Sequence, residues 1–257
     1  PPPPPPPFFF HAPAGSGDCL LSRGLGDVYK RQVIGDLNTH DKECRLLCAK
    51  AGCIVVAVDY RLAPESPFPA AVEDAWAALD WIASEGSKLG IDTTRLAVGG
   101  DSAGGNLSAV VALMARDASL DLRLQMLVYP ATDASKYYES FSENEDGPLL
   151  TVEVIEWFWS HYLGKATGDE VRNDWRFSPA KAASHNGVAP SYIATCSADP
   201  LRDEGNAYAA QLSEAGVNVQ HSMIEGQPHI LFQLFNICEG GKDLIDECAA
   251  ALDKAFG

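Results

Sequence analysis

Basic residues are scarce in this sequence. Lysine and arginine together number 19 against 35 aspartates and glutamates, which gives a formal net charge of −16. A surface this acidic repels nucleic acid and anionic membranes, so we expect neither as a partner. No apolar run in the sequence approaches the roughly 20 residues that a membrane-spanning helix needs. We therefore expect no membrane span.

Motifs for cofactors, metals and disulfides are missing as well. The sequence has neither the G-x-G-x-x-G pattern of a dinucleotide site nor the lysine that completes a P-loop. Its 7 cysteines include no C-x-x-C pair, so we expect reduced thiols in the core and no zinc or disulfide framework. The first residues also lack the charged and apolar regions of a secretory signal. These features predict a cytoplasmic protein that uses no metal or cofactor.

The first 32 residues differ from the rest of the chain. Pro1 to Pro7 form a polyproline run, and no sustained helical or strand period follows before residue 33. Polyproline favours an extended helix without internal hydrogen bonds, which is also the ligand of SH3-type grooves. We prefer the simpler interpretation that residues 1–32 are non-native or low-complexity sequence, and we exclude them from the fold.

From Val33 onward, patterns typical of strands and helices alternate. Short β-branched or apolar runs predict strands at 53–59, 124–130 and 191–196, the first of them buried on both faces. Partial alternation predicts a further strand at 217–224. Amphipathic or small-residue patterns predict helices at 41–51, 70–84, 106–115, 203–215 and 244–256. The alternation predicts an α/β fold, with a mostly parallel sheet and helices on both faces. Arg61 and Glu65, in a proline-rich loop, are expected to form a structural ion pair.

The alternation breaks between residues 131 and 183. An acidic stretch at 140–146 is followed by an aromatic segment at 149–163, and a helical insertion that lies over the sheet fits this pattern best. The aromatic side chains of Trp157 and Phe158 are candidates to line an acyl pocket. Simple packing of the insertion onto the body explains them equally well.

Gly100-Asp101-Ser102-Ala103-Gly104 is a G-x-S-x-G pattern between an apolar run and a helical segment. A serine on such a sharp strand-to-helix turn projects its hydroxyl away from the sheet. The backbone N–H of Ala103, at the start of the helix, then faces the place where an oxyanion would form. A glycine-rich turn that cradles phosphate is the alternative.

Two further residues fit the partners that a nucleophilic Ser102 needs. Ligands of open α/β sheets bind outside the carboxyl ends of the strands, and Asp199 and His229 each follow closely after a predicted strand. The order serine, aspartate, histidine is the one that this architecture uses. The imidazole would take the hydroxyl proton and the carboxylate would orient the imidazole. Asp203 is a rival to Asp199, although capping of the following helix explains it without catalysis.

Several motifs together resemble the hormone-sensitive-lipase-like carboxylesterases of the α/β-hydrolase fold. They are Gly-Asp-Ser102-Ala-Gly-Gly-Asn-Leu, Asp59-Tyr-Arg-Leu-Ala-Pro-Glu65, Pro67-Phe-Pro-Ala-Ala-Val-Glu-Asp74, Asp199-Pro-Leu-Arg-Asp203 and the late His229. The resemblance covers residues 33–257. It implies hydrolysis of small, short-acyl esters through an acyl-enzyme, without a cofactor. It also implies a partial helical cap, which includes an insertion at about 134–176. Asp101 and Ile230 are further candidates for the substrate pocket beside the two aromatic residues.

The sequence departs from this family at one motif. Family members carry His-Gly-Gly-Gly directly before a stretch like Val33-Ile34-Gly35-Asp36, and here Val28-Tyr29-Lys30-Arg31 stand in its place. The glycine N–H groups of that motif supply most of the oxyanion hole, and loss of one donor costs about 10²–10³ in rate. We therefore expect a truncated chain joined to unrelated sequence, with impaired turnover.

The sequence leaves other functions open. A deacetylase or amidase would use the same three side chains, and a non-catalytic ligand-binding protein would keep the fold without turnover. The sequence also leaves open whether the chain forms a homodimer.

Overall fold

The computed structural model describes residues 8–11, 19–22, 40–165 and 168–257. At the centre of these residues lies a seven-stranded sheet in the order β1-β3-β2-β4-β5-β6-β7. Strand β1 pairs antiparallel with β3, and the other pairs are parallel. The strands are β1 Phe8–His11, β2 Cys19–Ser22, β3 Ile54–Val58, β4 Leu96–Asp101, β5 Leu124–Val128, β6 Ser191–Ala198 and β7 Val219–Pro228. The mostly parallel sheet that the sequence predicts is confirmed.

Strands β1 and β2 lie inside the first 32 residues, which the sequence analysis excludes from the fold. Strand β2 runs between β3 and β4, with Cys19 opposite both Ile54 and Leu96. The expectation that this segment contributes no strand is wrong, because a run of four residues is too short to show a period. The polyproline run at 1–7 and the departure at 28–31 lie outside the described residues.

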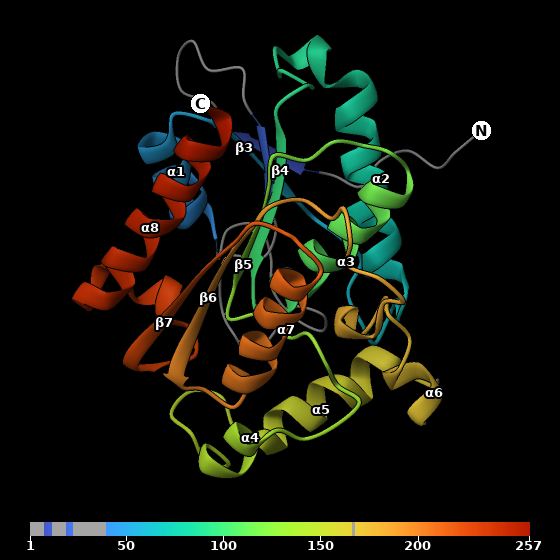
Figure 1. The fold of residues 1–257 in the computed structure, drawn as a ribbon, viewed down its shortest axis with the longest axis vertical. Coiled ribbons are helices and arrows are strands. Elements are labelled where there is room, and N and C mark those ends of the chain that lie inside the picture. Colours follow the sequence, from blue (N-terminus) through green and yellow to red (C-terminus); the bar gives the residue numbers. More distant parts are fainter. Residues whose placement is uncertain (1–7, 12–18, 23–39, 166–167) are drawn as a thin grey trace.

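Helices cover both faces of the sheet (Figure 1). Helices α1 (Asp41–Ala51) and α8 (Glu239–Phe256) pack on one face. Helices α2 (Ala70–Glu85), α3 (Ala103–Asp117) and α7 (Arg202–Glu214) pack on the other. Every residue of β3, β4 and β5 is buried. Burial on both faces is the reason that these strands are nearly continuous apolar runs in the sequence.

Two helix boundaries show how local sequence controls the helices. Helix α1 ends where it is predicted to end, because Gly52 adopts the left-handed conformation (φ 63°) that stops a helix. Helix α8 begins at Glu239, before the predicted start at Leu244. Its first turn contains two glycines, which are poor helix formers and hide the helical pattern.

The short 3₁₀ segments are η2 (Gly86–Leu89), η3 (Pro179–Lys181) and η4 (Leu231–Asn236).

The predicted helical insertion is present between β5 and β6. It contains α4 (Glu139–Glu143), α5 (Val152–Leu163) and α6 (Asp169–Arg172). Helices α4 and α5 lie together beyond the end of the sheet toward which β6 points (Figure 1). The side chain of Thr151 accepts a hydrogen bond from the N–H of Val154 at 3.2 Å and so caps α5. The insertion therefore covers the edge at which parallel strands present functional residues.

The loop between β3 and α2 is fixed by a different ion pair from the predicted one. The guanidinium of Arg61 binds both carboxylate oxygens of Asp74 at 2.8–3.1 Å, and it lies 3.4 Å from Glu73. The N–H of Arg61 also donates to Asp74 at 2.8 Å. Asp74 replaces the expected partner Glu65 because one helical carboxylate receives both the backbone and the forked side chain of Arg61.

No helix in the described part of the chain combines the length and the apolar character that crossing a membrane requires.

Candidate active site

Ser102 lies at the sharp turn between β4 and α3. Its backbone has φ 52° and ψ −117°, a conformation that is strained for a residue with a side chain. Its N–H donates to the carbonyl of Val128 at 2.8 Å, which ties the turn to the end of β5. A Cβ at Gly105 would stand 2.9 Å from the side chain of Pro130, so only glycine lets α3 approach this closely. The turn is the strand-to-helix elbow that the G-x-S-x-G pattern predicts.

The structure brings the side chains of Ser102, His229 and Asp199 into one hydrogen-bonded row. The Nε2 atom of His229 lies 2.9 Å from the hydroxyl oxygen of Ser102, and its Nδ1 atom lies 2.6 Å from Oδ2 of Asp199. Asp199 and His229 are fully buried. A proton on Nδ1 faces the carboxylate, so Nε2 is left to accept the proton of the serine hydroxyl.

Asp199 and His229 are held in place by backbone and ring contacts. The second oxygen of Asp199 accepts the N–H of Leu201 at 2.9 Å, so both carboxylate oxygens are hydrogen-bonded. His229 follows directly after β7, and the ring of Tyr129 packs against its imidazole with 4.5 Å between ring centroids. The hydroxyl of Tyr129 accepts the N–H of Phe232 at 3.2 Å. These contacts restrict the directions in which the carboxylate and the imidazole can turn.

Ala103 is the first residue of α3 and follows Ser102 directly. The first N–H groups of a helix have no acceptor within that helix, and the helix dipole adds partial positive charge at this end. The N–H of Ala103 is therefore a donor beside the serine hydroxyl. The positions that replace the expected His-Gly-Gly-Gly motif lie among residues 23–39, which the structure does not describe.

The four pocket candidates lie in different surroundings. Asp101 is fully buried, and its carboxylate accepts the side chain of Gln233 at 2.7 Å. Phe158 and Ile230 are partly buried and pack against the same apolar cluster of the insertion and α3. Trp157 is 44% exposed, and its ring packs at a tilt against that of His161 with 4.0 Å between ring centroids. The structure thus brings Phe158 and Ile230 to one cluster and places Trp157 on the outer side of α5.

The sequence suggests that Asp203 caps α7, but in the structure it does not. The N-cap residue is Leu201, without a side-chain hydrogen bond. Asp203 lies in the first turn, where its carboxylate accepts the N–H of Ser140 at 2.9 Å and pairs with Arg202 at 2.7 Å. Its role is thus a contact between α7 and the insertion.

Glu204 is a buried carboxyl next to this site that sequence analysis does not single out. It is 1% exposed and accepts the N–H groups of Thr132 at 2.6 Å and Asp133 at 3.4 Å. Burial raises the pKa of Glu204 to about 8. The two hydrogen bonds lower this pKa, but by less than burial raises it. The residue joins α7 to the segment after β5, a contact that no local pattern in the sequence predicts.

Within the described ranges, no three histidine, cysteine, aspartate or glutamate side chains converge in the way that metal ligands do. In the described part of the chain, Cys48, Cys196 and Cys248 are buried thiols outside any disulfide, and Cys238 is a partly buried one.

Comparison with known sequences gives consistent relatives. Residues 32–233 match the sequence profile of a family described as alpha/beta hydrolase fold. The carboxylic ester hydrolase LipN of Mycobacterium tuberculosis is 44% identical over 226 residues, which are 86% of this chain and 60% of that protein. Carboxylesterase NlhH of the same species is 46% identical, over 87% of this chain and 70% of its own length. The ethyl acetate hydrolase of Pseudomonas putida is 42% identical, over 80% and 65%. The chain thus spans 60–70% of the length of these relatives.

Solved structures agree with the sequence comparison. The ester hydrolase EH1AB1 from the metagenome of Lake Arreo, solved with a derivative of bipyridine phosphonate, superposes with a TM-score of 0.90 at 40% identity and covers 97% of this chain and 79% of its own. A structure named DphMB1 gives a TM-score of 0.90 at 41% identity, over 97% and 82%.

Proposed function

Because this chain belongs to the alpha/beta hydrolase family, we propose that it is a serine carboxylesterase that hydrolyses small esters with short acyl chains. The observation that carries the proposal is the row formed by Ser102, His229 and Asp199, with contacts of 2.9 and 2.6 Å. The relatives named as carboxylic ester hydrolases and as an ethyl acetate hydrolase support the same reaction class and a short acyl group.

The geometry supports a reaction in two halves. The imidazole of His229 takes the proton of Ser102 while the serine oxygen bonds to the ester carbonyl carbon. The tetrahedral intermediate collapses, the bond to the alcohol oxygen breaks, and the imidazolium protonates the departing alcohol. Water then attacks the acyl-serine with the same base, which releases the acid and restores Ser102. Asp199 stabilises the imidazolium in both halves and keeps its own charge.

The oxyanion of each tetrahedral intermediate needs N–H donors. Ala103 supplies one donor from the start of α3. The glycines of the His-Gly-Gly-Gly motif would supply others, and residues 28–31 of this sequence contain none of them. We expect turnover to lie below that of relatives that carry the motif, by about 10²–10³ for one lost donor.

The four pocket candidates have different roles in the proposed function. Phe158 and Ile230 border the same apolar cluster and are proposed to contact the acyl group. The carboxylate of Asp101 accepts a hydrogen bond from the side chain of Gln233 directly before the Ser102 turn, so we propose that Asp101 supports this turn. Trp157, 44% exposed, would reach substrate only from the outer side of α5.

The test is hydrolysis of p-nitrophenyl butyrate by the purified chain, with Ser102→Ala as the control. We expect release of p-nitrophenolate above the buffer rate, and a fall to background in the variant, because loss of a catalytic serine typically costs about 10⁶ in kcat. Equal rates for the folded wild type and the variant would refute the esterase. Release from p-nitroacetanilide with none from the ester would instead identify an amidase.

A further inference from the structure

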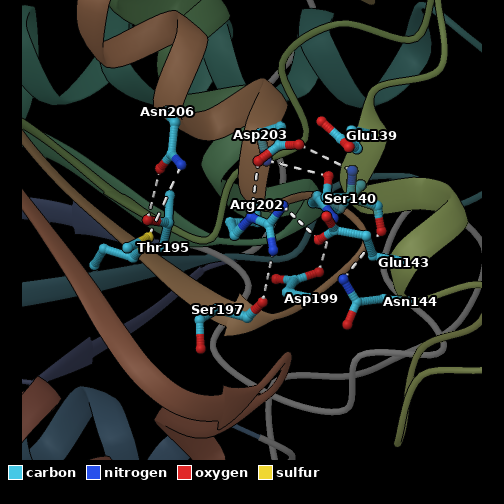
Figure 2. A network of polar contacts seen from close by, with 12 residues as sticks. Glu139, Ser140, Glu143, Asn144, Thr195, Ser197, Asp199, Arg202, Asp203 and Asn206 are labelled. Atoms are coloured by element: carbon cyan, nitrogen blue, oxygen red, sulfur yellow. Dashed lines mark hydrogen bonds and ion pairs between the residues drawn. The ribbon is translucent and has the colours of Figure 1, made fainter.

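The turn that presents Asp199 is bonded to the insertion as well as to the sheet. The hydroxyl of Ser140, in α4, donates to the carbonyl of Pro200 at 2.6 Å. The N–H of Ser140 donates to the carboxylate of Asp203 at 2.9 Å, and the N–H of Asp203 donates back to the Ser140 hydroxyl at 3.3 Å. Ser140 is fully buried. One serine of the insertion thus makes three hydrogen bonds to the residues that follow Asp199 (Figure 2).

Arg202 strengthens the same connection. Its guanidinium lies 2.8 Å from Glu143 of α4 and 2.7 Å from Asp203, and it donates to the carbonyl of Ser197 at 3.2 Å. Figure 2 shows the side chain of Arg202 between these three groups. Burial alone would raise the pKa of Asp203, but hydrogen bonds from Arg202 and Ser140 outweigh it and hold that pKa below its ordinary value. The carboxylate therefore keeps its charge at neutral pH.

Leu201 connects the insertion to Asp199 most directly. Its N–H holds Oδ1 of Asp199 at 2.9 Å. Its side chain is 4% exposed and packs in the apolar cluster that contains Phe141, Ile155 and Trp159 of the insertion. A shift of α4 would therefore move the residue that holds the carboxylate.

We propose that Ser140 is a positioning residue, which fixes the turn after β6 so that Asp199 meets His229 in the geometry for proton transfer. The insertion then also sets the alignment of the row formed by Ser102, His229 and Asp199. The kinetic test of this proposal rests on the proposed esterase function. A displacement of about 1 Å at a reacting group is enough to lower the rate about 10²-fold. The competing account is that the buried hydroxyl of Ser140 contributes to stability alone.

The chain offers a matched control for Ser140→Ala. Ser178 is also fully buried, its hydroxyl also donates to a backbone carbonyl at 2.6 Å, and it also accepts a backbone N–H, at 3.0 Å. Its partners are Arg172 and Ala134, outside the Asp199 turn. Ser178→Ala therefore removes an equivalent hydroxyl without touching the turn.

The first readout is the separation of kcat from KM for p-nitrophenyl butyrate. We expect Ser140→Ala to lower kcat about 10- to 100-fold with a smaller change in KM, because the variant misaligns the hydrogen-bonded row and leaves the residues that would contact the acyl group in place. Ser178→Ala should leave both constants close to those of the wild type. Equal losses of kcat in both variants, or a loss in Ser140→Ala that lies in KM alone, would overturn the positioning role.

The second readout needs no turnover. Proton NMR detects the strongly downfield proton between His229 and Asp199 in the free protein, and we expect Ser140→Ala to move it upfield or speed its exchange with solvent. An inactive wild type would refute the esterase while this measurement still tests Ser140. If circular dichroism shows that Ser140→Ala does not fold, Asp203→Asn takes its place, with the same expected direction. A resonance unchanged in the folded variant would overturn the proposal.

Discussion

The carboxyl group of Glu204 is buried at the start of α7 and is mostly protonated at neutral pH. Burial raises its pKa from the ordinary 4.5 to about 8, and the nearby charges of Asp133 and Asp199 add to the increase. The hydrogen bonds from Thr132 and Asp133 act in the opposite direction. A carboxyl whose pKa is raised by folding binds a proton more tightly in the folded state than in the unfolded state. Its contribution to stability is complete below pH 4.5 and is lost as the pH rises through about 8.

This titration gives a prediction for Glu204→Gln. The amide cannot ionise, so the variant lacks the loss of stability that the wild type suffers at high pH. Between pH 5.5 and 8.5 we expect the free energy of unfolding of the wild type to fall relative to the variant by about 3 kcal/mol. Urea unfolding at both pH values measures it, with Glu214→Gln on the exposed side of α7 as the control. A difference that does not depend on pH would contradict the assignment.

The sequence predicts the proximity of some residues of the candidate site and not of others. Ser102, Asp199 and His229 follow predicted strands closely, and strand ends meet at one edge of a parallel sheet. Their proximity therefore follows from local patterns, although their catalytic role stays a prediction. Glu204 and Ser140 acquire their partners 72 and 63 residues away in the chain. Such contacts depend on how the insertion packs, which no local pattern contains.

At the scale of elements, the contact between α8 and η4 supports the position of His229. Segment η4 begins at Leu231, just after His229, and lies against the first turn of α8. A Cβ at Gly241 would stand 2.6 Å from the carbonyl oxygen of Leu231 and 2.7 Å from the nitrogen of Phe235. Backbone atoms cannot give way as side chains do. Gly241 is therefore required for the close approach of these two elements.

Its neighbour Gly240 makes a matched comparison. A Cβ at Gly240 would meet only the flexible side chain of Gln227, at 3.2 Å. We expect Gly241→Ala to lower the free energy of unfolding by about 1–3 kcal/mol, because overpacking moves η4. Gly240→Ala should be neutral or stabilise by up to about 1 kcal/mol through helix propensity. Urea unfolding of both variants tests this, and equal effects would show that the close approach is unimportant.

Prediction of the elements follows their length and burial. Strands β3, β5 and β6 are mostly apolar runs of five or more residues, and their predicted bounds lie within a few residues of the observed ones. Strand β7 is polar and partly exposed, and its partial alternation predicts it at 217–224, against the observed Val219–Pro228. Strands β1 and β2 have four residues each and show no period of their own, so their place depends on pairing with β3 and β4. Pairing across the chain decides such short strands, and local propensity does not.

At the scale of the whole molecule, alternating elements were enough to predict a parallel sheet with helices on both faces. The sequence also predicts a helical insertion that lies over the sheet, and in the structure α4 and α5 lie beyond the end of the sheet toward which β6 points (Figure 1). Connections between layers were harder to predict. Arg61 pairs with Asp74, and Asp203 contacts Ser140, because ionic partners are chosen by the assembled surfaces and by the geometry of the carboxylate.

The proposed function requires that the folded chain activates the serine at position 102. Labelling with a p-nitrophenyl alkylphosphonate, followed by mass spectrometry of the intact protein and of its peptides, tests this activation. We expect one phosphonyl group per chain, bonded to Ser102 with release of p-nitrophenolate, and labelling that is at least about 10²-fold slower in His229→Ala. A folded chain that carries no adduct at Ser102, or that is labelled equally fast without His229, would contradict it.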